Sequence, residues 1–137
     1  RVEFYRSMHP KTNMIQGSIT DSEVYKEILQ DASKHNIELI IATPPCQGMS
    51  IANARKTNKD DPRNSLIKKV VSLTLELNPK YVLIENVRGM ASDKTFILDD
   101  DGNKINIMPF LVDKLGNDYE TRFWMQQTME LPTIASV

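Results

Sequence analysis

The segment Leu39-Ile40-Ile41-Ala42-Thr43-Pro44-Pro45-Cys46-Gln47-Gly48 decides the fold that this sequence predicts. Its first four residues form an unbroken apolar run, as expected for a central strand of a parallel sheet. The two prolines then end the strand, because each fixes a backbone dihedral angle and neither has an amide hydrogen to donate. Cys46, the only cysteine of the chain, follows directly. We therefore expect its thiol in a well-defined place at the carboxyl end of a strand.

A second segment has the same arrangement further along the chain. The apolar run 81–84 is followed directly by Glu85-Asn86-Val87-Arg88. Ligands of open parallel sheets bind beyond the carboxyl ends of the strands, so we expect Cys46 and Glu85 to face one pocket. Glu85 is expected to be partly desolvated, and a protonated carboxyl group can donate a hydrogen bond to a ring nitrogen. The alternatives are a small buried cysteine and an exposed glutamate that caps a turn.

Strands and helices alternate in the predicted secondary structure around these two segments. Predicted strands cover residues 13–19, 38–43, 81–84 and 119–126, and predicted helices cover 20–36, 61–77 and 106–115. The first helix is expected to begin with a capping box formed by Thr20 and Glu23. The second is expected to start at Asp61-Pro62 and to stop at Asn78-Pro79. Alternation of this kind predicts an α/β fold in which helices cover both faces of a parallel sheet.

Composition limits the classes of protein that fit this sequence. The 137 residues suffice for one domain with a modest core, and the net charge of −1 gives no overall electrostatic footprint for nucleic acid. A single cysteine excludes an intrachain disulfide framework and suits a reducing compartment. No apolar run is long enough to span a bilayer, and no signal peptide is visible. We therefore expect a cytoplasmic protein, and the start at Arg1 without a methionine indicates a piece of a longer chain.

The two motifs together resemble those of the DNA cytosine-5 methyltransferases. That family has Pro-Cys-Gln after one central strand and Glu-Asn-Val after the next, which match Pro45-Cys46-Gln47 and Glu85-Asn86-Val87. Residues 61–66 are similar to the start of the helix between them, and Gly17-Ser18-Ile19 is similar to a Gly-Asp-Ile of the family. The resemblance covers about residues 10–125. It implies a partial Rossmann-like, class I methyltransferase fold with three layers and a mostly parallel sheet.

The resemblance also implies a reaction and the residues that perform it. Cys46 would attack C6 of a cytosine in DNA, while Glu85 would bind or protonate N3 and draw charge off the ring. Asn86 would order the turn that places Glu85. The methyl group of S-adenosylmethionine would then pass to C5, and loss of the C5 proton would release the cysteine. The cytosine must be flipped out of the duplex for this attack.

Further residues are implied for cofactor and DNA. The candidate contacts to S-adenosylmethionine are Ser18, Ile19, Pro45 and Leu66. The candidate DNA contacts are Gln47, Ser50 and Arg55. Such contacts position a duplex without reading its sequence, and plain solvation of the loop charges stays an alternative. The family implies no metal and no membrane, and a bacterial cytoplasmic or nucleoid-associated protein of a restriction–modification system.

The sequence departs from the family pattern in ways that limit this interpretation. Ser18 replaces an acidic residue, Met49 a phenylalanine and Asn53 a glycine. The glycine-rich cofactor turn, the acidic residue that binds the ribose, the Gln-x-Arg-x-Arg segment and the target-recognition region are not found. Residues 1–137 are therefore expected to form the central part of a catalytic domain, inactive alone and with exposed sheet edges that favour association.

Other classes of protein stay open at this point. A tRNA cytosine-5 methyltransferase has a similar pair of motifs, and a non-catalytic or split-subunit partner of a methyltransferase would also retain them. The acidic run 99–103 is similar to the start of a calcium loop, but no glutamate closes it at the required spacing. A hairpin or surface turn is expected at residues 100–103 instead. A thiol oxidoreductase would need a second cysteine, which the chain does not have.

Overall fold

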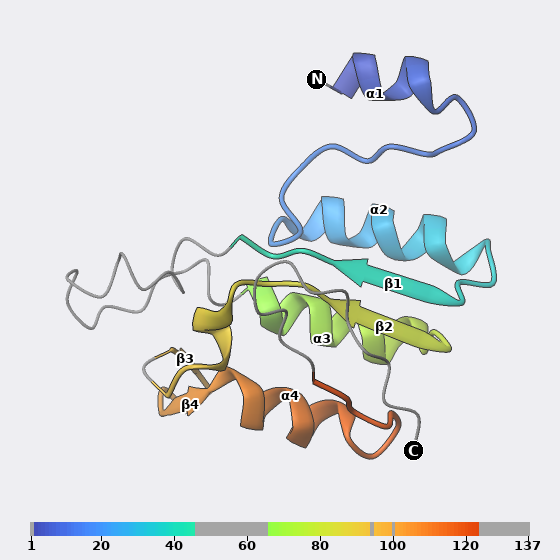
Figure 1. The fold of residues 1–137 in the computed structure, drawn as a ribbon. Coiled ribbons are helices and arrows are strands. Elements are labelled where there is room, and N and C mark those ends of the chain that lie inside the picture. The colour runs from blue at the N-terminus through green and yellow to red at the C-terminus, as the bar shows by residue number, and fades with distance from the viewer. Residues whose placement is uncertain (1, 46–65, 94, 100, 124–137) are drawn as a thin grey trace, which may run out of the picture.

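The computed structural model describes residues 2–45, 66–93, 95–99 and 101–123 (Figure 1). The α-helices are α1 (Val2–Met8), α2 (Ser22–Ser33), α3 (Leu66–Leu77) and α4 (Ile107–Leu115), and η3 (Arg88–Ala91) is a short 3-10 helix. The strands are β1 (Leu39–Ala42), β2 (Tyr81–Ile84), β3 (Phe96–Leu98) and β4 (Lys104–Asn106). None of these helices is long and apolar enough to cross a membrane.

The centre of the fold is a parallel pair of strands. β1 pairs with β2 over their whole lengths, with Leu39 opposite Tyr81 and Ala42 opposite Ile84. The two strands therefore end side by side, and α3 lies between them in the chain, as Figure 1 shows. α3 packs against α2 and also against α4. The predicted strands in 38–43 and 81–84 and the helix that ends before Asn78 are confirmed.

Within the described residues, the parallel sheet is smaller than the sequence predicted. Its two described strands form the only parallel pair within the described ranges, and β3 and β4 form a separate antiparallel hairpin. The strand predicted at residues 13–19 is wrong, because this segment forms no ladder, and residues 119–123 of the last predicted strand form none either. Residues 124–126 lie outside the described ranges. The observed fold is thus α/β with a two-stranded parallel sheet.

One face of this strand pair is open in the part of the chain that the structure describes. Leu39, Ile41 and Tyr81 have exposed fractions of 49%, 62% and 58%. Because side chains alternate along a strand, the first two project from the same face, and the register places Tyr81 beside Leu39. The prediction that helices cover both faces is therefore not met by the described residues.

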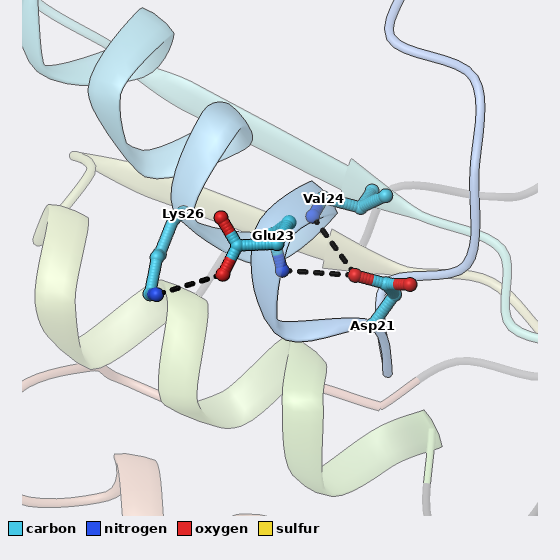
Figure 2. A network of polar contacts seen from close by, with 4 residues as sticks. All are labelled: Asp21, Glu23, Val24 and Lys26. Atoms are coloured by element: carbon cyan, nitrogen blue, oxygen red, sulfur yellow. Dashed lines mark hydrogen bonds and ion pairs between the residues drawn. The ribbon is translucent and has the colours of Figure 1, made fainter.

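The start of α2 differs from the predicted capping box (Figure 2). Asp21 is the N-cap, and its carboxylate accepts hydrogen bonds of 2.9 and 3.3 Å from the backbone amides of Glu23 and Val24. The carboxylate of Glu23 instead contacts the ammonium group of Lys26 at 2.9 Å. The hydroxyl of Thr20 pairs with that of Ser18. The capping box of Thr20 and Glu23 is therefore wrong, because an aspartate one residue later takes the orphan amides of the first turn.

The hydrophobic core lies to one side of the parallel strand pair, so the described residues do not enclose the pair between two buried layers. Its buried members come from α3, β3 and α4: Ile67, Val71, Ile97, Ile107, Phe110, Leu111 and Leu115. Ile84, the last residue of β2, packs against this cluster, as does Met90 of η3. The helix predicted at 106–115 is confirmed, with Asn106 as its N-cap and Gly116 as its C-cap. The core therefore anchors the chain on both sides of Glu85.

Candidate active site

The two segments singled out in the sequence meet beyond the ends of β1 and β2. The backbone amide of Glu85 donates a hydrogen bond of 2.9 Å to the carbonyl oxygen of Ala42, which continues the ladder by one step. The side-chain amide of Asn86 donates to the carbonyl oxygen of Pro44 at 2.9 Å. Its side-chain oxygen accepts from the amide of Val87 at 2.8 Å. The predicted meeting of the two strand ends is thus confirmed up to Pro44, two residues before Cys46.

The predicted nucleophile and DNA contacts lie outside the described ranges. These residues are Cys46, Gln47, Ser50 and Arg55, together with the polar loop and the Asp61-Pro62 helix start. The structure describes the chain into this segment as far as Pro45 and out of it from Leu66. The roles of these residues therefore stay predictions that rest on the motif.

Glu85 and Asn86 differ in their surroundings. Asn86 is half-buried between the two segments that it joins, whereas Glu85 is exposed. The sequence predicted a partly desolvated carboxyl group for Glu85, since four apolar residues precede it. In the structure these residues form β2, and only the last of them, Ile84, packs against the core cluster just before Glu85. The carboxyl group of Glu85 therefore lies in the open, at the same sheet edge as Pro44.

An apolar pocket of about 240 Å³ opens beside this junction. It is lined by Ile19, Ile40, Ile41, Ala42, Thr43, Pro44, Pro45, Leu66, Val70 and Leu73. Three of the four predicted cofactor contacts thus line one pocket: Ile19 before α2, Pro45 after β1 and Leu66 at the start of α3. Ser18 does not line it, and the oxygen of its hydroxyl lies 2.7 Å from that of Thr20.

Local packing explains how Ile19 reaches the pocket. A Cβ atom built on Gly17 would lie only 2.5 Å from Cγ2 of Val24, so the chain passes close against the first turn of α2. The amide of Asp21 donates to the carbonyl of Ser18 at 2.9 Å and closes the turn that contains Ile19. A side chain at residue 17 would force this segment away from α2, and Ile19 would move with it.

The sequence analysis missed two pocket residues on α3, Val70 and Leu73. Together with Leu66 they recur at spacings of four and three residues, which places them on one face of a helix. That periodicity was visible in the sequence. The sequence analysis placed Leu66 and Val70, but not Leu73, on the apolar face of the predicted helix, and it did not show that this face lines a pocket.

The acidic segment after β3 forms a turn. The carboxylate of Asp99 accepts hydrogen bonds from the backbone amides of Asn103 at 2.7 Å and Asp101 at 3.0 Å. These bonds, that of Asn103 foremost, hold the pKa of Asp99 below its usual value. The predicted turn is confirmed at these residues. Among the described residues, no group of three His, Cys, Asp or Glu side chains gathers in a way that could hold a metal ion.

The arrangement defines a class of site before any relative is considered. Parallel strands that end together beside an apolar pocket, with polar side chains at the tips, form the type of ligand site that α/β proteins build beyond the carboxyl ends of their strands.

The family pattern of the C-5 cytosine-specific DNA methylases matches residues 1–121. The chain belongs to this family.

Several curated proteins are similar to the chain. It is 32% identical over 126 residues to the type II methyltransferase M1.HgaI of Avibacterium volantium. The matched segment is 90% of the chain and 34% of that protein. It is 38% identical over 84 residues to the type II methyltransferase M.AquIA of Picosynechococcus, covering 59% of the chain and 33% of that protein. The chain thus spans about a third of the length of these relatives. No solved structure matches it at a significant level.

Proposed function

We propose that this chain is part of a DNA cytosine-5 methyltransferase of a bacterial restriction–modification system. The family match and the similarity to type II methyltransferases support the reaction class. The observation that carries the proposal is the hydrogen bond from Asn86 to Pro44. This bond supports a place for Glu85 beside Pro44 at the carboxyl ends of the two strands. The proposal adds that the thiol of Cys46 and the carboxyl group of Glu85 act on one substrate.

In this proposal the chain supplies a nucleophile and an acid. The thiolate of Cys46 forms a bond to C6 of a flipped-out cytosine, and the electron pair of the C5–C6 double bond moves into the ring. Glu85 donates a hydrogen bond or a proton to N3, which stabilises the charge that develops there. Asn86 keeps Glu85 in place. Removal of the C5 proton after methyl transfer restores the double bond and releases the thiolate.

The pocket beside the junction fits part of the proposed cofactor. S-adenosylmethionine supplies an electrophilic methyl group when it is bound. Ile19, Pro45 and Leu66 would hold its flat adenine end, since they line an apolar space, and Ser18 would offer a polar contact from the next position. The volume of about 240 Å³ lies below the roughly 300–1,000 Å³ of complete ligand pockets. The described residues therefore account for part of a cofactor site.

DNA contacts are assigned to the segment after Cys46. Gln47, Ser50 and Arg55 are proposed to approach the duplex, with Arg55 on a phosphate. A net charge of −1 requires that attraction to DNA be local to such a loop. The proposed setting is the cytoplasm or nucleoid of a bacterium.

A second candidate function has its own observation. A split-subunit or non-catalytic methyltransferase partner would need a surface for a second polypeptide. The open apolar face with Leu39, Ile41 and Tyr81, and the outer edges of β1 and β2, offer one. Methylation that appears only after a second polypeptide is added to the full-length protein would favour this candidate.

Adduct formation on DNA that contains 5-fluorocytosine tests the first candidate. The fluorine blocks loss of the C5 substituent, so the full-length protein should stay covalently bound in the presence of S-adenosylmethionine. Cys46→Ser should abolish the adduct. Glu85→Gln should lower turnover by about two to four orders of magnitude, the usual contribution of general acid catalysis, with the fold retained.

Glu38→Gln provides the matched control. Glu38 is exposed and directly precedes β1, at the opposite end of the strand pair, so the same substitution there should leave turnover unchanged. An adduct with the serine variant would remove Cys46 from the reaction. Full turnover by Glu85→Gln would do the same for Glu85.

A further inference from the structure

A buried hydroxyl contacts η3, the 3-10 helix that follows the turn Glu85-Asn86-Val87. Thr95 directly precedes β3 and has an exposed fraction of 7%. Its hydroxyl donates a hydrogen bond of 2.6 Å to the carbonyl oxygen of Gly89, which is itself buried in η3. The same carbonyl accepts the amide of Ser92 at 3.1 Å. Gly89 thus links η3 to the β3–β4 hairpin.

Helix η3 begins at Arg88, three residues after the candidate acid Glu85, and depends on the hydrogen bond between Thr95 and Gly89. Val87 is its N-cap and provides no side-chain hydrogen bond to the first turn. Short 3-10 helices have poorer hydrogen-bond geometry than α-helices, so the tertiary contacts of η3 decide where it lies. Met90 supplies an apolar contact to the core, and Thr95 supplies the buried polar contact.

The hairpin that carries Thr95 is fixed in turn. The side-chain amide of Asn106 donates to the carbonyl oxygens of Asp93 at 2.9 Å and Thr95 at 3.2 Å. Asn106 is also the N-cap residue of α4, whose first residue Ile107 is fully buried. A chain of hydrogen bonds therefore runs from Asn106, at the start of α4, through Thr95 to Gly89.

We propose that Thr95 is a positioning residue for the turn Glu85-Asn86-Val87. Asn86 holds this turn to the β1 side through Pro44, and Thr95 holds its continuation to the hairpin side through Gly89. With both ends fixed, the carboxyl group of Glu85 keeps its place at the sheet edge although it is exposed. The expected effect on catalysis rests on the proposed function, because Thr95 would act through Glu85.

The test compares three variants in the full-length protein. Thr95→Val keeps the shape of the side chain and removes the hydroxyl, whereas Thr95→Ser keeps the hydroxyl. Thr74→Val makes the same change at a fully buried threonine of α3 whose hydroxyl has no partner among the described residues. Amide hydrogen exchange is read at Met90 and Ser92.

In Thr95→Val both amides should exchange about tenfold faster, near the upper end of what one hydrogen bond contributes. The amide of Tyr81, which is bonded to Glu38 at the other end of the strands, should keep its rate. Thr95→Ser should restore the slow exchange, and Thr74→Val should not change it. The kcat for DNA methylation should fall about tenfold in Thr95→Val with an unchanged KM for S-adenosylmethionine.

Each outcome decides the inference. Unchanged exchange at Met90 and Ser92 in Thr95→Val overturns it, and so does equal acceleration in Thr74→Val, which would indicate general loosening. Faster exchange with full kcat overturns the link from Thr95 to Glu85. If the wild-type protein methylates no DNA, the proposed function fails, while the exchange rates still decide whether Thr95 holds the turn.

Discussion

The side-chain amide of Asn86 lies 2.9 Å from the carbonyl oxygen of Pro44, a residue 42 positions earlier in the chain. This bond joins the segments that leave β1 and β2, beyond the last pair of the parallel ladder. Pro44 and Pro45 have no amide hydrogens, so a carbonyl oxygen is what the backbone offers at these two positions for a link across the strand tips. An asparagine after Glu85 is suited to it, because its side chain can donate to Pro44 while accepting from Val87.

We predict that Asn86→Asp destabilises the protein by about 1–2 kcal/mol and lowers methylation. The carboxylate can still accept from Val87, but it replaces the donor to Pro44 with a second acceptor. Urea unfolding and turnover in the full-length protein check this. Asn13→Asp makes the same change at an exposed site and should stay within about 0.5 kcal/mol of wild type. Equal stability of Asn86→Asp and wild type would show that the bond to Pro44 contributes little.

Filling the apolar pocket should block the cofactor. Leu66→Trp adds a large side chain to the pocket that Leu66 lines with Ile19 and Pro45, so we expect at least tenfold weaker binding of S-adenosylmethionine. Titration calorimetry on the full-length protein measures it. Leu75→Trp on the same helix is the control, because Leu75 is 45% exposed and does not line the pocket. Unchanged affinity in Leu66→Trp would place the cofactor elsewhere.

The sequence was sufficient to predict the elements whose signals are local. β1 and β2 were predicted because short apolar runs end at Pro44 or at a charged residue, and α4 because an apolar face ends at Gly116. Their meeting followed from the rule that parallel strands end together. The junction at Pro44 and Asn86 could therefore be expected before any coordinates.

Two kinds of feature could not be predicted in this way: the choice between neighbouring residues that could each cap a helix, and contacts between residues far apart in the sequence. Residues 13–19 have the composition of a strand but no described neighbour to pair with, and Met14 instead accepts a hydrogen bond from Arg6 through its carbonyl. Asp21 is the cap in place of Thr20, because its carboxylate accepts hydrogen bonds from the amides of Glu23 and Val24. The sequence predicted a hairpin or surface turn at residues 100–103, but it did not predict that Thr95, directly before β3, donates a hydrogen bond to Gly89.

A hydrogen bond between α2 and α3 should give the protein a pH dependence at high pH. The hydroxyl of Tyr25 donates to the carboxylate of Glu76 at 2.7 Å. Partial burial, followed by this carboxylate, raises the pKa of Tyr25 well above its ordinary value of about 10. The folded state thus holds this proton more tightly than the unfolded state. The resulting stabilisation is fully present below pH 10 and is lost as the pH rises further.

The variant Tyr25→Phe should therefore lower the free energy of unfolding by about 1 kcal/mol at pH 7. Its deficit relative to wild type should shrink above pH 10, as measured by urea unfolding at several pH values. Tyr5→Phe removes the hydroxyl of an exposed tyrosine on α1 and serves as the control. A deficit that stays constant up to pH 11 would show that the hydroxyl proton of Tyr25 is not held by Glu76.

The end of α3 requires a residue with positive φ. Asn78 has φ of 45°, and its amide donates to the carbonyl of Thr74 at 2.8 Å, so it closes the helix in the left-handed region. Asn78→Ala should cost about 1–2 kcal/mol, because a Cβ atom is strained there without the local polar compensation of asparagine. Asn78→Gly should be close to neutral. Thermal unfolding measures both variants, and an alanine variant as stable as the glycine variant would contradict the left-handed geometry at this position.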